Sequence, residues 1–327
     1  MTLFIKVSFA LLATFSVASA QTQTVRLALD WVPNTNHTGI YVALANGWFE
    51  EAGVDLKILP YGGVLPEVLV ANGRAEVAVS STESVLGAAA AGEPVVSVAA
   101  MLSTNTAALA VLKDSGITRP RELDGKVYAA FGVPWEAPAI ATVLRRDGGE
   151  GDFRSAVLNV AGFDALLAGR ADFVWIFGGW QGVQAELEGI DLTLFNFNDY
   201  GVPDYYTPVL VASPEGIQTN AEALRAFLQA TARGYTYAAE NPAEAAELLL
   251  QEAPAGSFPN PELVRKSQER VSSFYIAEGQ TWGVQRPDYW RGFPELLLDA
   301  GVFAEASETV RNAVGNGSLF TNELLPE

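Results

Sequence analysis

Cysteine is absent from the sequence, and His37 is the only histidine. Without cysteine the chain can form no disulfide, thiolate metal site, cysteine nucleophile or lipidated membrane anchor. A zinc site would have to consist mainly of carboxylates, and no H-E-x-x-H spacing occurs. The G-x-S-x-G, Walker and G-x-G-x-x-G motifs are also missing. We therefore expect no metal, no other cofactor and no catalytic residue.

Basic side chains are scarce, because 20 lysines and arginines face 38 aspartates and glutamates, giving a formal net charge of −18. Binding to nucleic acid needs a basic face, which this sequence does not offer. Hydrophobic residues make up 49% of the chain and charged residues 18%, as in globular proteins. A length of 327 residues suits two α/β lobes or one large domain.

No apolar run is long enough to span a membrane, and the first residues form a shorter targeting pattern. Lys6 precedes an apolar run that starts at Val7, and Ala18-Ser19-Ala20 has the A-x-A form of a cleavage site. This pattern predicts a signal peptide over residues 1–20 that is cleaved after Ala20. We expect a soluble periplasmic monomer with no membrane anchor.

Apolar strands and helices alternate through the first part of the chain. The expected strands are Val25–Leu29, Val54–Leu59, Ala75–Val79 and Val95–Met101. This order predicts a mostly parallel sheet in which each strand releases a polar loop at the same edge. A second series follows Ala107–Leu112, with strands at Lys126–Ala130 and Val157–Val160.

An internal repeat supports two lobes. Leu69–Ser84 and Leu166–Trp180 share the order helix, Gly-Arg-Ala-acid, apolar strand and polar or aromatic loop. We expect a first lobe over 21–110, a second over 111–206, and a return to the first over 207–327. Two crossing segments, near Ala108–Leu112 and Thr207–Ala212, would form a hinge. The return part is predicted to be helical at Ala221–Ala239, Pro242–Gln251, Pro261–Tyr275, Pro287–Ala300 and Ala304–Val314.

The loop Asp30–Tyr41, with the sequence DWVPNTNHTGIY, lies between a predicted strand and a predicted helix. Ligands bind at such strand ends in α/β sheets. The expected loops around this site contain no lysine or arginine but many aromatic and acidic residues. A flat ring with an amino group would suit them. The candidate ligand-binding residues are Trp31, Asn36, His37, Tyr41, Ser81, Thr82, Asn105, Trp135, Glu136, Trp180 and Tyr206.

Each candidate also has a purely structural explanation. Trp31 and Trp180 can fill the interface between the lobes, and His37 can orient its own loop. Ser80–Glu83 has the spacing of a helix cap. Glu136 would interact favourably with a helix dipole without any ligand. Tyr205 and Tyr206 can pack at the hinge.

Asp30–Leu56, with the sequence DWVPNTNHTGIYVALANGWFEEAGVDL, closely resembles the bacterial periplasmic binding proteins for thiamine pyrimidine precursors. The resemblance continues through NGRAEVAVSSTES, PRELDGKVYAAFGVP and FGGWQGVQAELEGIDL. It implies a type II periplasmic binding fold, with two α/β lobes, a central cleft, a two-strand hinge and a helical C-terminal part packed on the first lobe. It also implies delivery of formylaminopyrimidine or hydroxymethylpyrimidine to an ABC transporter permease.

The same fold is shared by the fungal thiamine pyrimidine synthases, in which a lysine that carries pyridoxal phosphate and a histidine consumed as substrate follow the third strand. Here the matching positions hold Ser80 and Ser84, and the fungal cysteine cluster is matched by Asp204-Tyr205-Tyr206-Thr207. An imine-forming amine and iron ligands are thus missing. The resemblance therefore favours a binding protein over an enzyme.

Three hypotheses follow. In the first, Trp31 and either Trp180 or Tyr206 stack on an aminopyrimidine, while Asn36, His37 and a carboxylate such as Glu136 bond its polar edge. In the second, helix amino ends hold a sulfonate, nitrate or carboxylate. In the third, the protein is an enzyme of pyrimidine or histidine metabolism.

Overall fold

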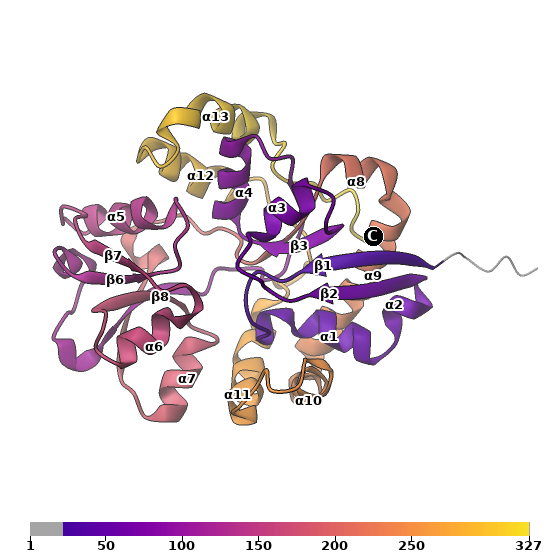
Figure 1. The fold of residues 1–327 in the computed structure, drawn as a ribbon, viewed down its shortest axis with the longest axis horizontal. Coiled ribbons are helices and arrows are strands. Elements are labelled where there is room, and N and C mark those ends of the chain that lie inside the picture. Colours follow the sequence, from indigo (N-terminus) through magenta and orange to yellow (C-terminus); the bar gives the residue numbers. More distant parts are fainter. Residues whose placement is uncertain (1–21, 327) are drawn as a thin grey trace, which may run out of the picture.

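The computed structural model describes residues 22–326, so the expected signal peptide at residues 1–20 lies outside the described residues. Two five-stranded mixed sheets form two lobes, each with helices on both faces (Figure 1). The first sheet has the order β2-β1-β3-β10-β4, and the second has the order β7-β6-β8-β5-β9. The strands are β1 (Gln23–Ala28), β2 (Val54–Leu59), β3 (Val77–Ser80), β4 (Val96–Ala100), β5 (Ala107–Leu112), β6 (Val127–Ala130), β7 (Arg154–Val157), β8 (Phe173–Phe177), β9 (Leu192–Asn196) and β10 (Val209–Ala212).

The central strands of the first sheet are short apolar runs because both of their faces are covered. Every residue of β3 and β10 is buried. Strand β1 pairs in parallel with β2 and β3, whereas β10 pairs antiparallel with β3 and β4. Strand β10 therefore returns from the second lobe into the middle of the first sheet. The chain has the α/β architecture with two lobes that the sequence predicts.

The helices cover both sheets and dominate the last third of the chain (Figure 1). They are α1 (Thr38–Ala45), α2 (Trp48–Glu51), α3 (Pro66–Ala71), α4 (Thr82–Ala91), α5 (Glu136–Arg146), α6 (Gly162–Leu167), α7 (Gln181–Glu188), α8 (Pro214–Thr219), α9 (Ala221–Glu240), α10 (Pro242–Glu252), α11 (Pro261–Val271), α12 (Tyr289–Asp299) and α13 (Ser307–Asn316). Within residues 22–326, none of the helices has the length and apolar character needed to cross a membrane.

Helix α9 packs closely on α1 and fixes the loop that precedes α1. A Cβ atom at Gly234 would lie 1.9 Å from the carbonyl oxygen of Gly39, so the two helices approach at two glycines. The hydroxyl of Tyr235 on α9 donates to the carbonyl of Asn36 at 2.5 Å. The C-terminal helical part thus packs on the first lobe and holds the loop Asp30–Tyr41 in place.

One of the later helices, α11, also touches the second lobe. Ser267 on α11 lies 2.6 Å from the Thr35 hydroxyl, and it donates a hydrogen bond to the carbonyl of Gly179 in the second lobe. Arg270, also on α11, pairs with Glu186 of α7 at 2.8 Å. Helix α11 therefore connects the two lobes as well as covering the first one.

The two segments that cross between the sheets are bonded to each other. The amide of Met101 donates to the carbonyl of Pro208 at 3.0 Å. The carboxylate of Asp204 accepts from the Thr104 hydroxyl at 2.8 Å and from the Asn105 amide at 3.2 Å. Because one carboxylate holds both crossings, a rotation of the lobes must bend the two segments together.

Some element bounds differ from the expected ones. The strand expected at Val157–Val160 runs over Arg154–Val157, because Asn159 takes a left-handed backbone with a φ of 53° and ends the strand. The helix expected at Pro261–Tyr275 ends at Val271, and a 3-10 turn follows over Ser272–Phe274. The last expected helix, Ala304–Val314, begins as a 3-10 turn before α13.

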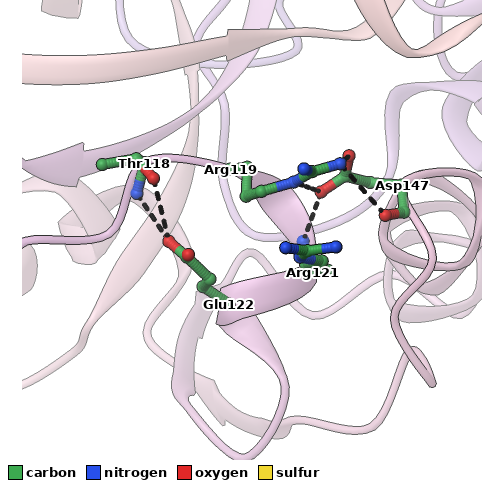
Figure 2. Close-up of polar contacts among 5 residues, drawn as sticks. All are labelled: Thr118, Arg119, Arg121, Glu122 and Asp147. Atoms are coloured by element: carbon green, nitrogen blue, oxygen red, sulfur yellow. Dashed lines mark hydrogen bonds and ion pairs between the residues drawn. The ribbon is translucent and has the colours of Figure 1, made fainter.

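A polar network joins the start of the second lobe to the end of α5 (Figure 2). Asp147 follows α5 and accepts from Arg119 Nε at 2.9 Å and from the Arg121 amide at 3.0 Å. The guanidinium of Arg119 holds the pKa of the Asp147 carboxyl below its usual range. Nearby, Glu122 accepts from the Thr118 amide at 2.7 Å and so closes the turn that contains Arg119.

Asp147→Asn is expected to lower the melting temperature by a few degrees, because the amide cannot accept the paired bonds of a guanidinium. Because the pKa of Asp147 is lowered in the folded chain, its carboxylate stabilises the folded state at pH values above the ordinary aspartate pKa. This stabilisation is lost as the pH falls through the lowered pKa. Thermal unfolding at several pH values measures both effects. Asp191→Asn is the control, because Asp191 pairs with Lys113 at 3.6 Å with both side chains exposed. An equal shift of the melting temperature in both variants would contradict the stabilising role of Asp147.

Candidate ligand-binding site

A cavity of about 170 Å³ lies between the lobes and is lined by both of them. Its wall includes Asp30 and Trp31 after β1, and Ser81 after β3. Phe131 after β6 and Phe177 at the end of β8 face it from the second lobe. The carboxyl ends of parallel strands from both sheets therefore meet at this cavity, which is where α/β sheets bind ligands.

Aromatic side chains form much of the wall. Trp31 contributes from the first lobe, and Trp135 and Trp175 contribute from the second. The rings of Trp135 and Trp175 pack edge to face with centroids 5.7 Å apart. Tyr61 of the first lobe meets Phe131 of the second at 5.9 Å, so aromatic contact spans the cavity. A flat apolar ring can stack on such walls.

The charged groups in the wall are all acidic. Among the described residues, the lining contains no lysine, arginine or histidine. Its carboxyl groups belong to Asp30, Glu67, Glu83 and Glu136. A small anion would meet uncompensated repulsion in this wall, whereas a ligand with N–H donors or a positive charge would be attracted.

Glu136 is buried and is fully used by its own lobe. Its Oε1 accepts from the Tyr128 hydroxyl at 2.5 Å and from the Phe131 amide at 3.0 Å. Its Oε2 accepts from the Gly132 amide at 3.0 Å. Burial, together with the charge of Glu136, raises the pKa of Tyr128 well above its usual value, so the phenol stays a donor. Glu136 thus holds the loop that carries Phe131 into the wall.

His37 is completely buried behind the wall rather than in it. Its Nδ1 accepts from the Asn34 amide at 3.3 Å, which leaves the proton on Nε2. Nε2 lies 3.0 Å from Oδ1 of Asp30 and donates to it. A capping box at Asn34 fixes the short turn Thr35–His37. These contacts fit the alternative in which His37 orients its loop, and they aim Asp30 at the cavity.

Glu67 and Glu83 are the wall's least satisfied acids. Glu67, on the first turn of α3, is 4% exposed, and Ser80 donates to its Oε1. Glu83, on the first turn of α4, is 1% exposed. Within residues 22–326, Oε2 of each has no hydrogen-bond partner. Burial raises the pKa of Glu67, and it raises the pKa of Glu83 to about 7.

The sequence placed Glu83 among the loop acids and in the helix-cap spacing Ser80–Glu83, and nothing in it marked Glu67. An acid on the first turn of a helix behind Pro66 is an ordinary pattern that favours the helix dipole, so it gives no signal of burial. Only the fold brings the start of α3 against the end of β3, where Ser80 meets Glu67.

Five of the sequence candidates line the cavity and six do not. The lining holds Trp31, Asn36, Ser81, Trp135 and Glu136. Ser81 also caps α4 by accepting from the Ser84 amide at 3.2 Å. The candidates outside the lining are His37, Tyr41, Thr82, Asn105, Trp180 and Tyr206.

Those six have structural contacts. Trp180 is 9% exposed and packs in an apolar cluster with Tyr41 and with residues of α10 and α11. The Thr82 hydroxyl donates to the carbonyl of Tyr206 at 2.8 Å, and the Tyr206 hydroxyl accepts from the Arg286 amide at 2.9 Å. Asn105 accepts from the Ala107 amide at 2.8 Å.

Glu83 should make the unliganded protein less stable as the pH rises. Because its pKa is raised in the folded chain, the folded state gains stability below the ordinary glutamate pKa and loses it as the pH rises through about 7. The loss amounts to about 3 kcal/mol by the usual conversion. Denaturant unfolding between about pH 5 and about pH 8 measures it. Glu83→Gln should flatten this pH dependence, and an unchanged slope would contradict the assignment.

Comparison with known proteins agrees with this architecture. The profile of the family described as "NMT1/THI5 like" matches residues 34–245. A formylaminopyrimidine-binding protein of Halalkalibacterium halodurans is 32% identical over 303 residues, which is 87% of this chain and 90% of the relative. A protein of Legionella pneumophila named 4-amino-5-hydroxymethyl-2-methylpyrimidine phosphate synthase is 28% identical over 70% of this chain and 74% of the relative.

Among solved structures, the alkanesulfonate-binding protein SsuA of Xanthomonas axonopodis pv. citri superposes with a TM-score of 0.64. It is 15% identical, and the match covers 89% of this chain and 96% of that one. This likeness shows the fold alone. The chain belongs to the NMT1/THI5-like family and has the fold of the periplasmic binding proteins.

Proposed function

We propose that the protein is the solute-binding component of an ABC importer and captures a thiamine pyrimidine precursor, formylaminopyrimidine or hydroxymethylpyrimidine, between its lobes. One observation carries the proposal: the cavity combines aromatic walls with four carboxyl groups and, among its described lining residues, no basic side chain. An aminopyrimidine offers a flat ring for the walls and N–H donors for the acids. The relative named for formylaminopyrimidine supports the same ligand class.

A small anion suits this cavity poorly. The amino ends of helices are the usual sites for an anion without basic side chains. Here Glu136 begins α5 and accepts the amides of Phe131 and Gly132, and Glu83 lies in the first turn of α4. An acid thus already occupies each of these helix starts. The relative with a sulfonate in its name shares the fold alone.

Pyrimidine synthesis is a weaker candidate, although several relatives are named as synthases. Ser80 and Ser84, which stand where the fungal enzymes have lysine and histidine, both line the cavity. Ser80 is bonded to Glu67. A serine cannot form an imine with an aldehyde cofactor, so neither residue can take the role of the lysine. Within the described part of the chain, no cluster of three or more metal-ligating side chains was found.

Export and delivery complete the proposal. The sequence expectation of a signal peptide at residues 1–20 would place the mature monomer in the periplasm, beside the permease that receives its ligand. The Asp204 ties between the crossing segments and the α11 contacts with the second lobe provide a route from ligand binding to lobe closure.

Isothermal titration of the chain from Gln21 onward with formylaminopyrimidine, hydroxymethylpyrimidine, thiamine, taurine and nitrate tests the ligand class. We expect saturable binding of a pyrimidine, with no competition from taurine or nitrate. Binding of taurine or nitrate alone would contradict the proposal.

Trp31→Ala tests the aromatic wall. We expect at least about a tenfold loss of pyrimidine affinity with a nearly unchanged melting temperature, because Trp31 is partly exposed in the cavity wall. Trp180→Ala is the matched control: it should lower the melting temperature more, because Trp180 packs in the cluster with Tyr41. Equal affinity in wild type and Trp31→Ala would show that the ring binds elsewhere.

A further inference from the structure

We infer that Glu67 is the residue that reads the ligand's polar edge, and that it selects rings in which a ring nitrogen and an exocyclic amino group share one carbon. This inference rests on the proposed function and adds the residue and the chemical pattern that determine specificity. The carboxyl group of Glu67 would accept from the amino group and share one proton with the neighbouring ring nitrogen. No covalent bond changes in this recognition.

The geometry around Glu67 supports the assignment. Its side chain lines the cavity from the start of α3 and is 4% exposed. Ser80, the last residue of β3, donates to Oε1 and fixes the plane of the carboxyl group. In the described residues, Oε2 has no partner, and Oε1 keeps a second lone pair beside its bond from Ser80, so both oxygens can bond a ligand. A buried polar atom without a partner costs free energy that a bound donor would recover.

The other acids of the wall are less suited to this role. Asp30 accepts from His37, and Glu136 accepts three hydrogen bonds from its own lobe. Glu83 has an unpartnered oxygen, but the hydroxyls of Ser81 and Tyr205 already lie beside its carboxyl group. Glu67 combines a hydrogen bond that fixes its orientation with a buried oxygen that has no partner among the described residues.

The surroundings of Glu67 favour a bound proton. Ser80 faces it from β3, Ser84 from α4 and the Asp30 carboxylate from the loop after β1. Burial and the negative charge of Asp30 raise its pKa, and the hydroxyls lower it by less. A protonated carboxyl group has one donor and one acceptor. The donor of the protonated carboxyl group would face the ring nitrogen, and its acceptor would face the amino group. A carboxylate would match a ring that is protonated at that nitrogen.

A pH dependence follows with a definite sign. Whether the shared proton lies on Glu67 or on the ring nitrogen, the complex contains one proton more than a free carboxylate and a free neutral ring contain together. Affinity should therefore fall as the pH rises above the pKa of Glu67 in the free protein, provided the ring is neutral there. The hydroxyls of Ser80 and Ser84 do not titrate in this range.

The test is a cycle of two proteins and two ligands, measured by isothermal titration. The ligands are 4-amino-5-hydroxymethyl-2-methylpyrimidine and the same compound without its amino group. Removing the amino group should weaken binding to the wild type by about 10- to 100-fold. The same removal should have little effect on Glu67→Ala, because the partner of the amino group is already missing.

Glu67→Gln sharpens the test, because an amide keeps one donor and one acceptor but cannot titrate. We expect it to bind the aminopyrimidine within about tenfold of the wild type and to lose the pH dependence. In Glu83→Ala, a buried acid of the same wall, removal of the ligand's amino group should cost as much as in the wild type.

The outcomes separate this inference from the proposed function. Pyrimidine binding with an equal amino-group effect in wild type and Glu67→Ala would overturn the role of Glu67 while leaving the proposed function intact. Loss of the amino-group effect in Glu83→Ala alone would move the role to Glu83 and likewise overturn the inference. Absence of any pyrimidine binding to the wild type would refute the proposed function itself. Circular dichroism of each variant confirms that it is folded.

Discussion

A buried carboxyl group needs a donor or a proton, and this requirement determines the chemistry of the cavity between the lobes. Glu136 meets it with three donors from its own lobe, and the partly exposed Asp30 accepts from His37. Glu67 and Glu83 meet it only in part, and burial raises the pKa of both. In the proposed function, this unmet requirement favours ligands with N–H donors over anions.

The fold gathers these carboxyl groups around one cavity because strand ends from two sheets meet there. Strand β10 returns to the centre of the first sheet, so the crossings that frame the cavity are anchored in its most buried part. Asp204 ties the crossings to each other, and α11 reaches from the first lobe to α7. A ligand between the lobes can therefore influence their relative position through a small number of polar contacts.

Much of the fold was predictable because its strands are continuous apolar runs between turn residues. Val54–Leu59 agrees with the expected bounds to the residue. The end of the strand at Val157 was missed, because no local pattern announces the left-handed backbone of Asn159. The periodicity of apolar residues predicts where strands and helices lie. Where each one ends depends on the backbone of single residues such as Asn159.

The site was less predictable because proximity to a loop does not tell which way a side chain faces. Trp31 and Trp180 both follow strands, yet the first lines the cavity and the second packs with Tyr41 behind it. The acid-rich, base-free character of the loops was visible in the sequence and agrees with the wall. Glu67 was invisible, because its burial comes from tertiary packing of α3 on β3.

The central claim is that an amino-bearing pyrimidine occupies the acid-lined cavity between the lobes. A crystal structure of the complex with formylaminopyrimidine tests it most directly. The account predicts the ring between Trp31 and the aromatic side chains of the second lobe, with its amino group within hydrogen-bonding distance of a carboxyl group of the wall. A ring bound outside the lining, or one whose amino group faces away from every acid, would contradict it.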